Sequence, residues 1–174
     1  KWMDEKGISD KDGAIKELSS SVEMLNRCGA EVIVIACNTV HVFHEHLQSL
    51  SKAVIFNMIR IAAESLNGTS RAGILSSSFT RSSGLYHDAL KARGIEIFSA
   101  TDEQQGFIDT MIDRAISGNT GVSEQRLLHK IIRTMKNDGA EQVILGCTEL
   151  PLIGLSPAHY LDPGVKVLQR ALAA

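Results

Sequence analysis

The segment GAEVIVIAC, residues 29–37, recurs without a gap as GAEQVILGC, residues 139–147, at a constant offset of 110 positions (147 − 37). Each copy reads as the end of a helix, a turn, an apolar run and then a cysteine followed by polar residues. A continuous, largely β-branched apolar run is typical of a strand buried on both faces of a parallel sheet. The repeat therefore predicts an α/β fold of two related units, each with a thiol at the carboxyl end of a strand.

Helix and strand patterns alternate along the rest of the chain, after a polar, turn-like segment at residues 1–12. Alternation with short connections predicts parallel sheets with helices on both faces, so that each unit has three layers. We expect Ser123 to cap the helix that it begins. The predicted helices are 11–27, 39–50, 59–66, 80–92, 103–116, 123–136 and 164–172, and the predicted strands are 32–36, 53–57, 71–75, 95–98 and 142–145.

The constant offset between the two copies predicts two pseudo-symmetric parallel-sheet units with the active site in the cleft between them. The first half is expected to comprise residues 1–58 together with 155–174, because the last helix is predicted to fold back onto the first unit. The second half is expected to comprise residues 59–154.

The composition is that of an ordinary globular protein of 174 residues, with 44% hydrophobic and 22% charged residues. The formal net charge of −2 gives no indication of a nucleic-acid or membrane partner. Three cysteines, an odd number, argue against a secreted disulfide framework and favour a reducing, cytoplasmic location.

The two repeated cysteines, Cys37 and Cys147, are the candidate catalytic groups. Ligands of parallel α/β sheets bind beyond the carboxyl ends of the strands, and each cysteine is expected there, at the start of a helix. Free N–H groups at a helix start can hold a carboxylate, and their field favours thiolate, which predicts a thiol pKa below about 8.5. Asn38, Thr39 and Thr148 add side-chain donors. Two thiols that face one cleft can move a proton from one face of a carbon to the other.

Other polar residues carry weaker signals. A single cysteine is often only a small buried apolar side chain, and Cys28, whose counterpart in the repeat is Asp138, is expected to be structural. The hydroxyls of residues 76–80 suit an anionic ligand, but serine and threonine are also common helix caps.

No metal or cofactor is expected. The histidines His41, His44 and His46 lack a matching third ligand, and the usual zinc-binding spacings are absent. No glycine-rich phosphate loop indicates a nucleotide.

The segments ACNTVH (residues 36–41) and GCTELPL (residues 146–152), in this order and spacing, resemble the aspartate/glutamate racemase family. Ser77, Thr80 and the stretch SGLY (residues 83–86) resemble the turn and helix of that family's second domain. The similarity runs over essentially the whole chain and places the family's N-terminal strand and glycine-rich turn ahead of Lys1. It is strongest to the aspartate racemase branch, because typical glutamate racemases carry histidine where this chain has Glu149.

The resemblance implies cofactor-independent racemisation of an acidic amino acid, with aspartate as the first expectation and glutamate or a broad specificity as alternatives. It implies a homodimer, and it places Ile116 near the position at which some aspartate racemases carry a substrate-binding lysine. By analogy, one cysteine removes the α-proton as thiolate and the other delivers a proton as thiol. The implied catalytic residues are Cys37 and Cys147, and the implied substrate-binding residues are Asn38, Thr39, Ser77, Thr80, Thr148 and Glu149.

Several alternatives stay open at this stage. Related enzymes of the same architecture racemise hydantoins, isomerise maleate or decarboxylate arylmalonates, although a decarboxylase needs only one proton donor. A thiol redox protein would need the two sulfurs at disulfide geometry, with Cα atoms less than about 7 Å apart. A non-catalytic amino-acid-binding protein would bind its ligand without exchanging the α-proton.

Overall fold

The computed structural model describes residues 2–4 and 7–173. Lys1, Glu5, Lys6 and Ala174, which fall in the predicted N-terminal segment and in the first predicted half, lie outside the described residues. Where the sequence indicated only a polar turn, the chain opens with a short antiparallel hairpin of β1 (Met3–Asp4) and β2 (Gly7–Ile8).

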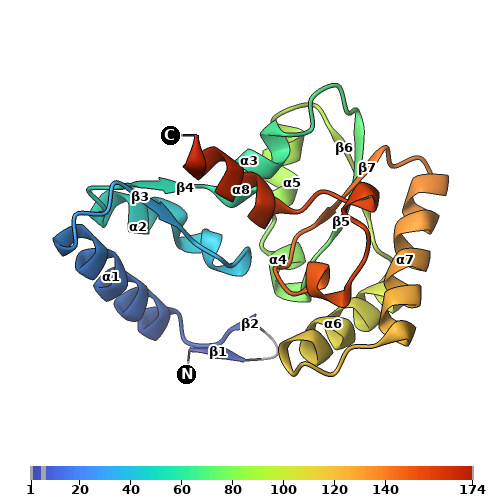
Figure 1. Cartoon of the computed structure of the whole chain (residues 1–174), viewed down its shortest axis with the longest axis horizontal. Helices are drawn as coiled ribbons and strands as arrows, with labels where there is room; N and C mark the ends of the chain where they lie inside the picture. The colour runs from blue at the N-terminus through green and yellow to red at the C-terminus, as the bar shows by residue number, and fades with distance from the viewer. Residues whose placement is uncertain (1, 5–6, 174) are drawn as a thin grey trace.

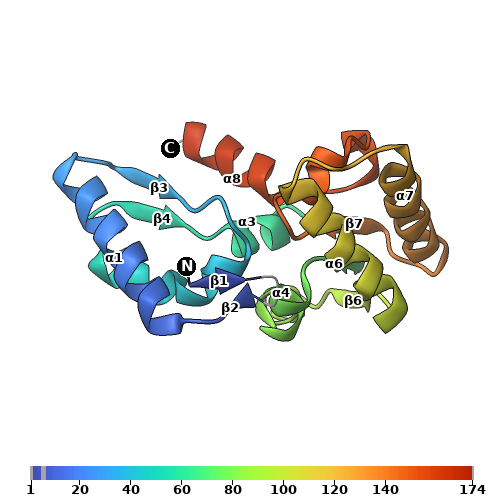
Figure 2. The ribbon, with the colours of Figure 1, turned by 90° about the horizontal axis from the view of Figure 1, so that it is seen from below.

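The first parallel sheet consists of β3 and β4, in which Val32 is paired with Val54. Ile33 and Ile55 pack towards α1 and α2 on one face of this sheet, whereas Val34 and Phe56 pack towards α3 and α8 on the other. Figures 1 and 2 show the two strands enclosed by these helices. The elements are α1 (Lys11–Arg27), β3 (Val32–Val34), α2 (His44–Leu50), β4 (Val54–Phe56), α3 (Met58–Glu64) and α8 (Pro163–Leu172).

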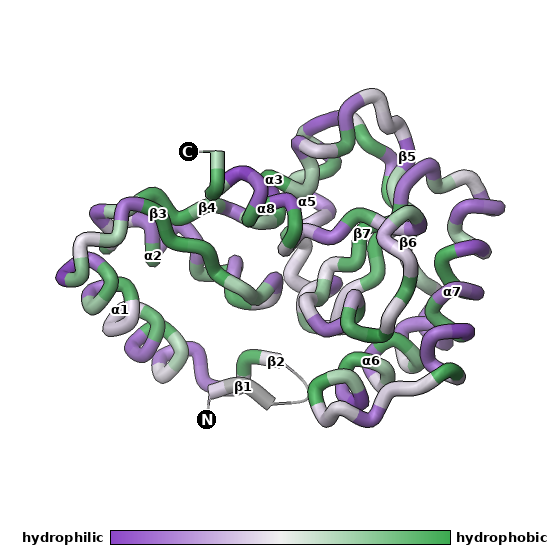
Figure 3. Tube along the Cα trace, viewed as in Figure 1, coloured by the Kyte–Doolittle hydropathy of each residue, from purple (hydrophilic) through white to green (hydrophobic). Residues whose placement is uncertain are grey.

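The second parallel sheet has the strand order β6-β5-β7. Helices α6 and α7 cover one of its faces, and α3 and α5 cover the other. Figure 3 shows that α7 is hydrophobic on the side towards the sheet and hydrophilic on its outer side. The elements are β5 (Arg71–Leu75), α4 (Ser78–Ser82), α5 (Leu85–Lys91), β6 (Glu96–Ser99), α6 (Asp102–Ile116), α7 (Val122–Asn137) and β7 (Gln142–Leu145).

The predicted α/β architecture with parallel, helix-covered sheets is therefore confirmed. The two copies of the repeat form β3 and β7, one in each sheet. The last helix, α8, returns to the first sheet, where Val167 is fully buried against Met58 and Ile61. The exact bounds of two half-domains stay a prediction.

Three local predictions were wrong, each for a physical reason. The helix predicted at 39–50 begins as a 3-10 turn, Thr39–Phe43, and only then becomes α2. The helix predicted at 80–92 is divided into α4 and α5 by Gly84, whose φ of +75° ends one helix and begins the next. Ser123 is not the cap of α7: Gly121 occupies that position, and the Ser123 hydroxyl donates to Glu124 instead.

Candidate functional site

Both candidate catalytic cysteines lie just beyond the carboxyl ends of repeated strands, and both are half-buried free thiols. Cys37 follows β3 and Cys147 follows β7. Burial raises the pKa of both thiols most, the carboxylate of Glu149 raises both further, and a negative charge on Cys37 adds a smaller increase to the pKa of Cys147. The fold thus brings Cys37, Cys147 and Glu149 close enough for their charges to interact.

A chain of hydroxyls joins the segment after β3 to the segment after β5. The hydroxyl oxygens of Thr39 and Thr80 are hydrogen-bonded at 2.9 Å, and the Ser77 hydroxyl donates to Thr80 Oγ1 at 3.2 Å. Ser77 also caps α4, where its oxygen accepts the N–H of Thr80. Three of the predicted substrate-binding residues therefore form one connected group.

Asn38, which follows Cys37, is 2% exposed. Its amide oxygen accepts a 2.6 Å hydrogen bond from the hydroxyl of Tyr86, while its amide nitrogen is buried and has no hydrogen-bond partner among the described residues. A buried donor without a partner is rare and costly, so it needs an explanation such as a ligand. From the sequence, Tyr86 stood only in the stretch SGLY that resembles the family's second domain, and no role was assigned to it.

The second cysteine is held as a thiol by its neighbours. Cys147 donates to Glu149 Oε2 at 2.9 Å, and the Thr148 hydroxyl donates to the same oxygen at 2.9 Å. Burial raises the pKa of Cys147 most, and the hydrogen bond and the negative charge of Glu149 raise it further. Because all three effects favour the neutral form, Cys147 is protonated over a wide pH range.

The first cysteine has a more balanced environment. Burial also raises the pKa of Cys37, but backbone N–H groups of Val40 and Thr39 and the Thr39 hydroxyl act in the opposite direction by stabilising the thiolate. The prediction that both thiols titrate below the ordinary value was wrong. Each cysteine is followed by a short 3-10 turn, Thr39–Phe43 or Leu150–Ile153, and the N–H groups of such a short turn do not offset desolvation.

His41 ties the loop that carries Cys37 to the start of α3. Its Nε2 atom accepts the N–H of Met58 at 3.0 Å, so the ring proton resides on Nδ1, which donates to the carbonyl oxygen of Cys37 at 2.8 Å. Burial lowers the pKa of His41, which keeps the ring neutral. From the sequence, His41 was weighed and set aside as a metal ligand and stood in the segment ACNTVH; the structure shows that both of its nitrogens bind backbone groups.

The other histidines in this region also have protein partners. Nε2 of His44 lies 2.9 Å from the carbonyl oxygen of Ile55, and Nε2 of His46 lies 3.3 Å from the hydroxyl of Ser19. Within residues 2–4 and 7–173, no group of three or more His, Cys, Asp or Glu side chains is placed to hold a metal ion. In the same part of the chain, no helix is both long enough and apolar enough to cross a bilayer.

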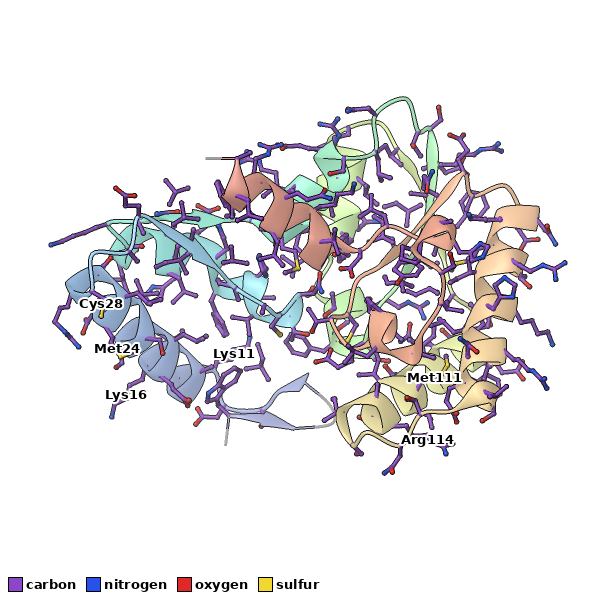
Figure 4. All side chains as sticks on the ribbon, viewed as in Figure 1. Lys11, Lys16, Met24, Cys28, Met111 and Arg114 are labelled. Atoms are coloured by element: carbon purple, nitrogen blue, oxygen red, sulfur yellow. The ribbon has the colours of Figure 1, made fainter. Side chains whose placement is uncertain are left out.

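Two remaining residues of the sequence analysis lie at helix ends. Cys28 is exposed at the end of α1, across the molecule from Met111 and Arg114 of α6 (Figure 4). Ile116, the last residue of α6, is 66% exposed.

Thr80 and Tyr86 line a cavity of about 260 Å³. The other residues that line it come from β5, β6 and the segments beside them and include neither candidate cysteine.

Comparisons with known proteins point to one family. A family model described as Asp/Glu/Hydantoin racemase matches residues 5–174. The glutamate racemase of Aquifex aeolicus (strain VF5) is 25% identical over 171 residues, which cover 96% of this chain and 65% of that protein. The broad specificity amino-acid racemase RacX of Bacillus subtilis (strain 168) is 26% identical over 145 residues, which cover 81% of this chain and 62% of that protein. This chain thus spans somewhat less than two thirds of either relative.

Among solved structures, an aspartate racemase homologue from Pyrococcus horikoshii OT3 superposes with a TM-score of 0.79 at 24% sequence identity. The match covers 93% of this chain and 74% of that one. The two proteins share a fold.

Proposed function

This chain belongs to the Asp/Glu/hydantoin racemase family, and we propose that it is a cofactor-independent amino-acid racemase in which Cys37 and Cys147 transfer protons on opposite faces of the α-carbon. The observation that carries the proposal is the placement of two half-buried thiols just beyond the carboxyl ends of the two repeated strands. Burial raises the pKa of both thiols, and a negative charge on Cys37 further opposes ionisation of Cys147, so once Cys37 ionises the pair consists of one thiolate and one thiol. Two-base racemisation requires that combination.

The surroundings of the two thiols support different starting roles. Cys37 receives N–H and hydroxyl groups that stabilise its thiolate, whereas Cys147 donates to Glu149 and is held as a thiol. As the pH rises Cys37 therefore ionises before Cys147, so that Cys37 serves as the base and Cys147 as the acid. The Cys37 thiolate removes the α-proton, and the Cys147 thiol gives its proton to the opposite face of the carbanion. The cysteines end with exchanged protonation states, and a substrate of the opposite hand restores them.

Donors beside the cysteines support the binding of an amino acid. The buried amide nitrogen of Asn38, which has no hydrogen-bond partner among the described residues, supplies a donor for the α-carboxylate of a bound amino acid. The hydroxyls of Thr39, Ser77 and Thr80 supply further groups that donate or accept. In this proposal Thr148 and Glu149 hold Cys147 in its acid form. The site lies between the two sheet-containing units.

Aspartate is the first substrate to test, because the sequence around Cys147 resembles that of aspartate racemases. Glutamate and a broader set of amino acids are the next, since the relatives at about 25% identity include a glutamate racemase and a broad specificity amino-acid racemase. Hydantoin racemisation is the second candidate function, supported by the breadth of the matched family. A homodimer and a cytoplasmic location stay predictions.

Proton NMR in heavy water tests the proposal. The protein is incubated with L-aspartate, L-glutamate, a neutral L-amino acid or a 5-substituted hydantoin, and the α-proton signal and optical rotation are followed together. We expect both signals to decay for at least one amino acid. Exchange only with the hydantoin would favour the second candidate, and the absence of exchange with every substrate would contradict both.

A further inference from the structure

Tyr86 connects segments that are far apart in the sequence. It belongs to α5 and is 3% exposed. Its hydroxyl reaches Asn38, 48 positions away along the chain, and its ring lies against Gly146, the residue before Cys147. One side chain therefore contacts the segment next to each candidate catalytic cysteine.

The hydrogen bond from Tyr86 determines what Asn38 offers to a ligand. A side-chain amide has one oxygen, which accepts, and one nitrogen, which donates two hydrogens. Because the Tyr86 hydroxyl donates to the Asn38 oxygen at 2.6 Å, the amide is held with its oxygen occupied. The nitrogen is left buried and without a partner, as a donor suited to a carboxylate.

The ring of Tyr86 restricts the backbone on the other side. A Cβ atom built on Gly146 would lie 2.7 Å from Tyr86 Cε2 and 3.2 Å from the Cβ of Ser76. Contacts below 3.0 Å require a shift, so the close approach of ring and backbone needs glycine here. In the other copy of the repeat the equivalent residue is Ala36, which is exposed. The repeat thus departs from symmetry where Tyr86 packs.

We propose that Tyr86 is a positioning residue of the candidate site, which orients the Asn38 amide as a donor to the substrate's α-carboxylate and fixes the backbone next to Cys147. This role rests on the proposed racemase function for its kinetic consequences. Its structural consequence, a fixed orientation of the Asn38 amide, is measurable without any substrate.

The Tyr86→Phe variant removes the hydroxyl and keeps the ring that packs on Gly146. Without this hydroxyl nothing holds the Asn38 oxygen, so the amide is free to turn and presents its donor to the carboxylate less often. We therefore expect KM for the amino acid to rise about tenfold, with a much smaller change in kcat, because carboxylate binding is common to ground and transition states. Tyr160→Phe is the matched control, since Tyr160 is the other of the chain's two tyrosines and packs against the core between α6, α7 and the second sheet.

A double-variant cycle separates positioning from general loss of structure. If Tyr86 acts through Asn38, Tyr86→Phe combined with Asn38→Ala will have the KM of Asn38→Ala alone. If instead the increase in KM of the double variant equals the product of the increases in the two single variants, Tyr86 acts independently of Asn38 and the inference is overturned.

Side-chain amide NMR gives the second readout, with the Asn38 signal identified by its loss in Asn38→Ala. We expect the signal to shift in Tyr86→Phe and to be unchanged in Tyr160→Phe. An unshifted signal in Tyr86→Phe overturns the inference even if the protein racemises amino acids. A shifted signal in a protein that exchanges no α-proton supports the positioning of Asn38 and contradicts the racemase.

Discussion

Replacing Glu149 by glutamine is the perturbation whose effect the site geometry defines most sharply. In the native protein the Glu149 carboxylate accepts the Cys147 S–H at 2.9 Å and opposes formation of the Cys147 thiolate. Glutamine keeps the size of the side chain but removes the charge, and its amide can donate to the thiolate. The Cys147 thiolate is therefore more populated in Glu149→Gln at any given pH.

The expected size of this effect follows from the distance. Two unit charges about 4 Å apart interact by about 4 kcal/mol at an effective dielectric constant of about 20, and by about 1 kcal/mol in bulk water. Cys147 is half-buried, so its interaction with Glu149 lies between these limits. An increase of at least about tenfold in the thiolate population, equivalent to about 1.4 kcal/mol, is the expected result.

Alkylation by iodoacetamide measures this population, because the thiolate is the reactive form. The experiment follows the peptides that contain Cys37 and Cys147 by mass spectrometry, at one mildly alkaline pH and in a Cys28→Ala background that removes the exposed third thiol. Glu103→Gln, which removes the same charge from an exposed position on α6, is the matched control. We expect Cys147 to react at least about tenfold faster in Glu149→Gln and at the native rate in Glu103→Gln.

Equal or slower alkylation of Cys147 in Glu149→Gln would refute the reasoning. It would mean that burial alone holds Cys147 as a thiol, and that Glu149 has no part in assigning the acid role. A comparable acceleration in Glu103→Gln would show that the effect is not specific to the hydrogen-bonded carboxylate.

The remaining predictions concern pH, the core and His41. Burial raises the pKa of Cys37 above its ordinary value, so its thiolate forms only as the pH rises. We therefore expect kcat/KM for α-proton exchange to increase into the alkaline range, and a kcat/KM that does not change with pH would contradict this. Leu128 is fully buried between α7 and the second sheet, so Leu128→Ala should lower the free energy of unfolding, measured by urea denaturation, by about 2–5 kcal/mol. Leu172→Ala, at a 90% exposed position, should change it by less than about 0.5 kcal/mol. Equal losses in the two variants would refute the assigned core. His41→Ala leaves the Met58 N–H and the Cys37 carbonyl without their partner and should lower the free energy of unfolding by about 1–3 kcal/mol for each group left buried. His87→Ala, at an exposed position, is the control. Similar urea midpoints for the two variants would be evidence against the bridging role of His41.

The sequence predicted the elements whose signals are local. Helix α1 and strands β5 and β7 have the predicted bounds, because each is a periodic or apolar run closed by turn residues. The repeat also located both cysteines at the carboxyl ends of parallel strands. In these cases the pattern of side chains along one short segment determines the structure.

The features that the sequence did not predict depend on contacts between distant segments. The direction of the thiol pKa shifts is set by burial and by Glu149, whereas the prediction rested on a helix start alone. Tyr86 has the pattern of an ordinary core residue, and its role appears only when the fold brings it to Asn38 and Gly146. His41 likewise acquires its role from the start of α3.

The central claim is that Cys37 and Cys147 act together on one α-carbon. Its most direct test first identifies an amino acid whose α-proton the native protein exchanges. It then compares exchange of that substrate in heavy water for Cys37→Ala, Cys147→Ala and Cys28→Ala. The account predicts that either of the first two substitutions abolishes racemisation in both directions, and that Cys28→Ala retains the native rate. Retention of more than a few per cent of turnover by a folded Cys37→Ala or Cys147→Ala variant would contradict it.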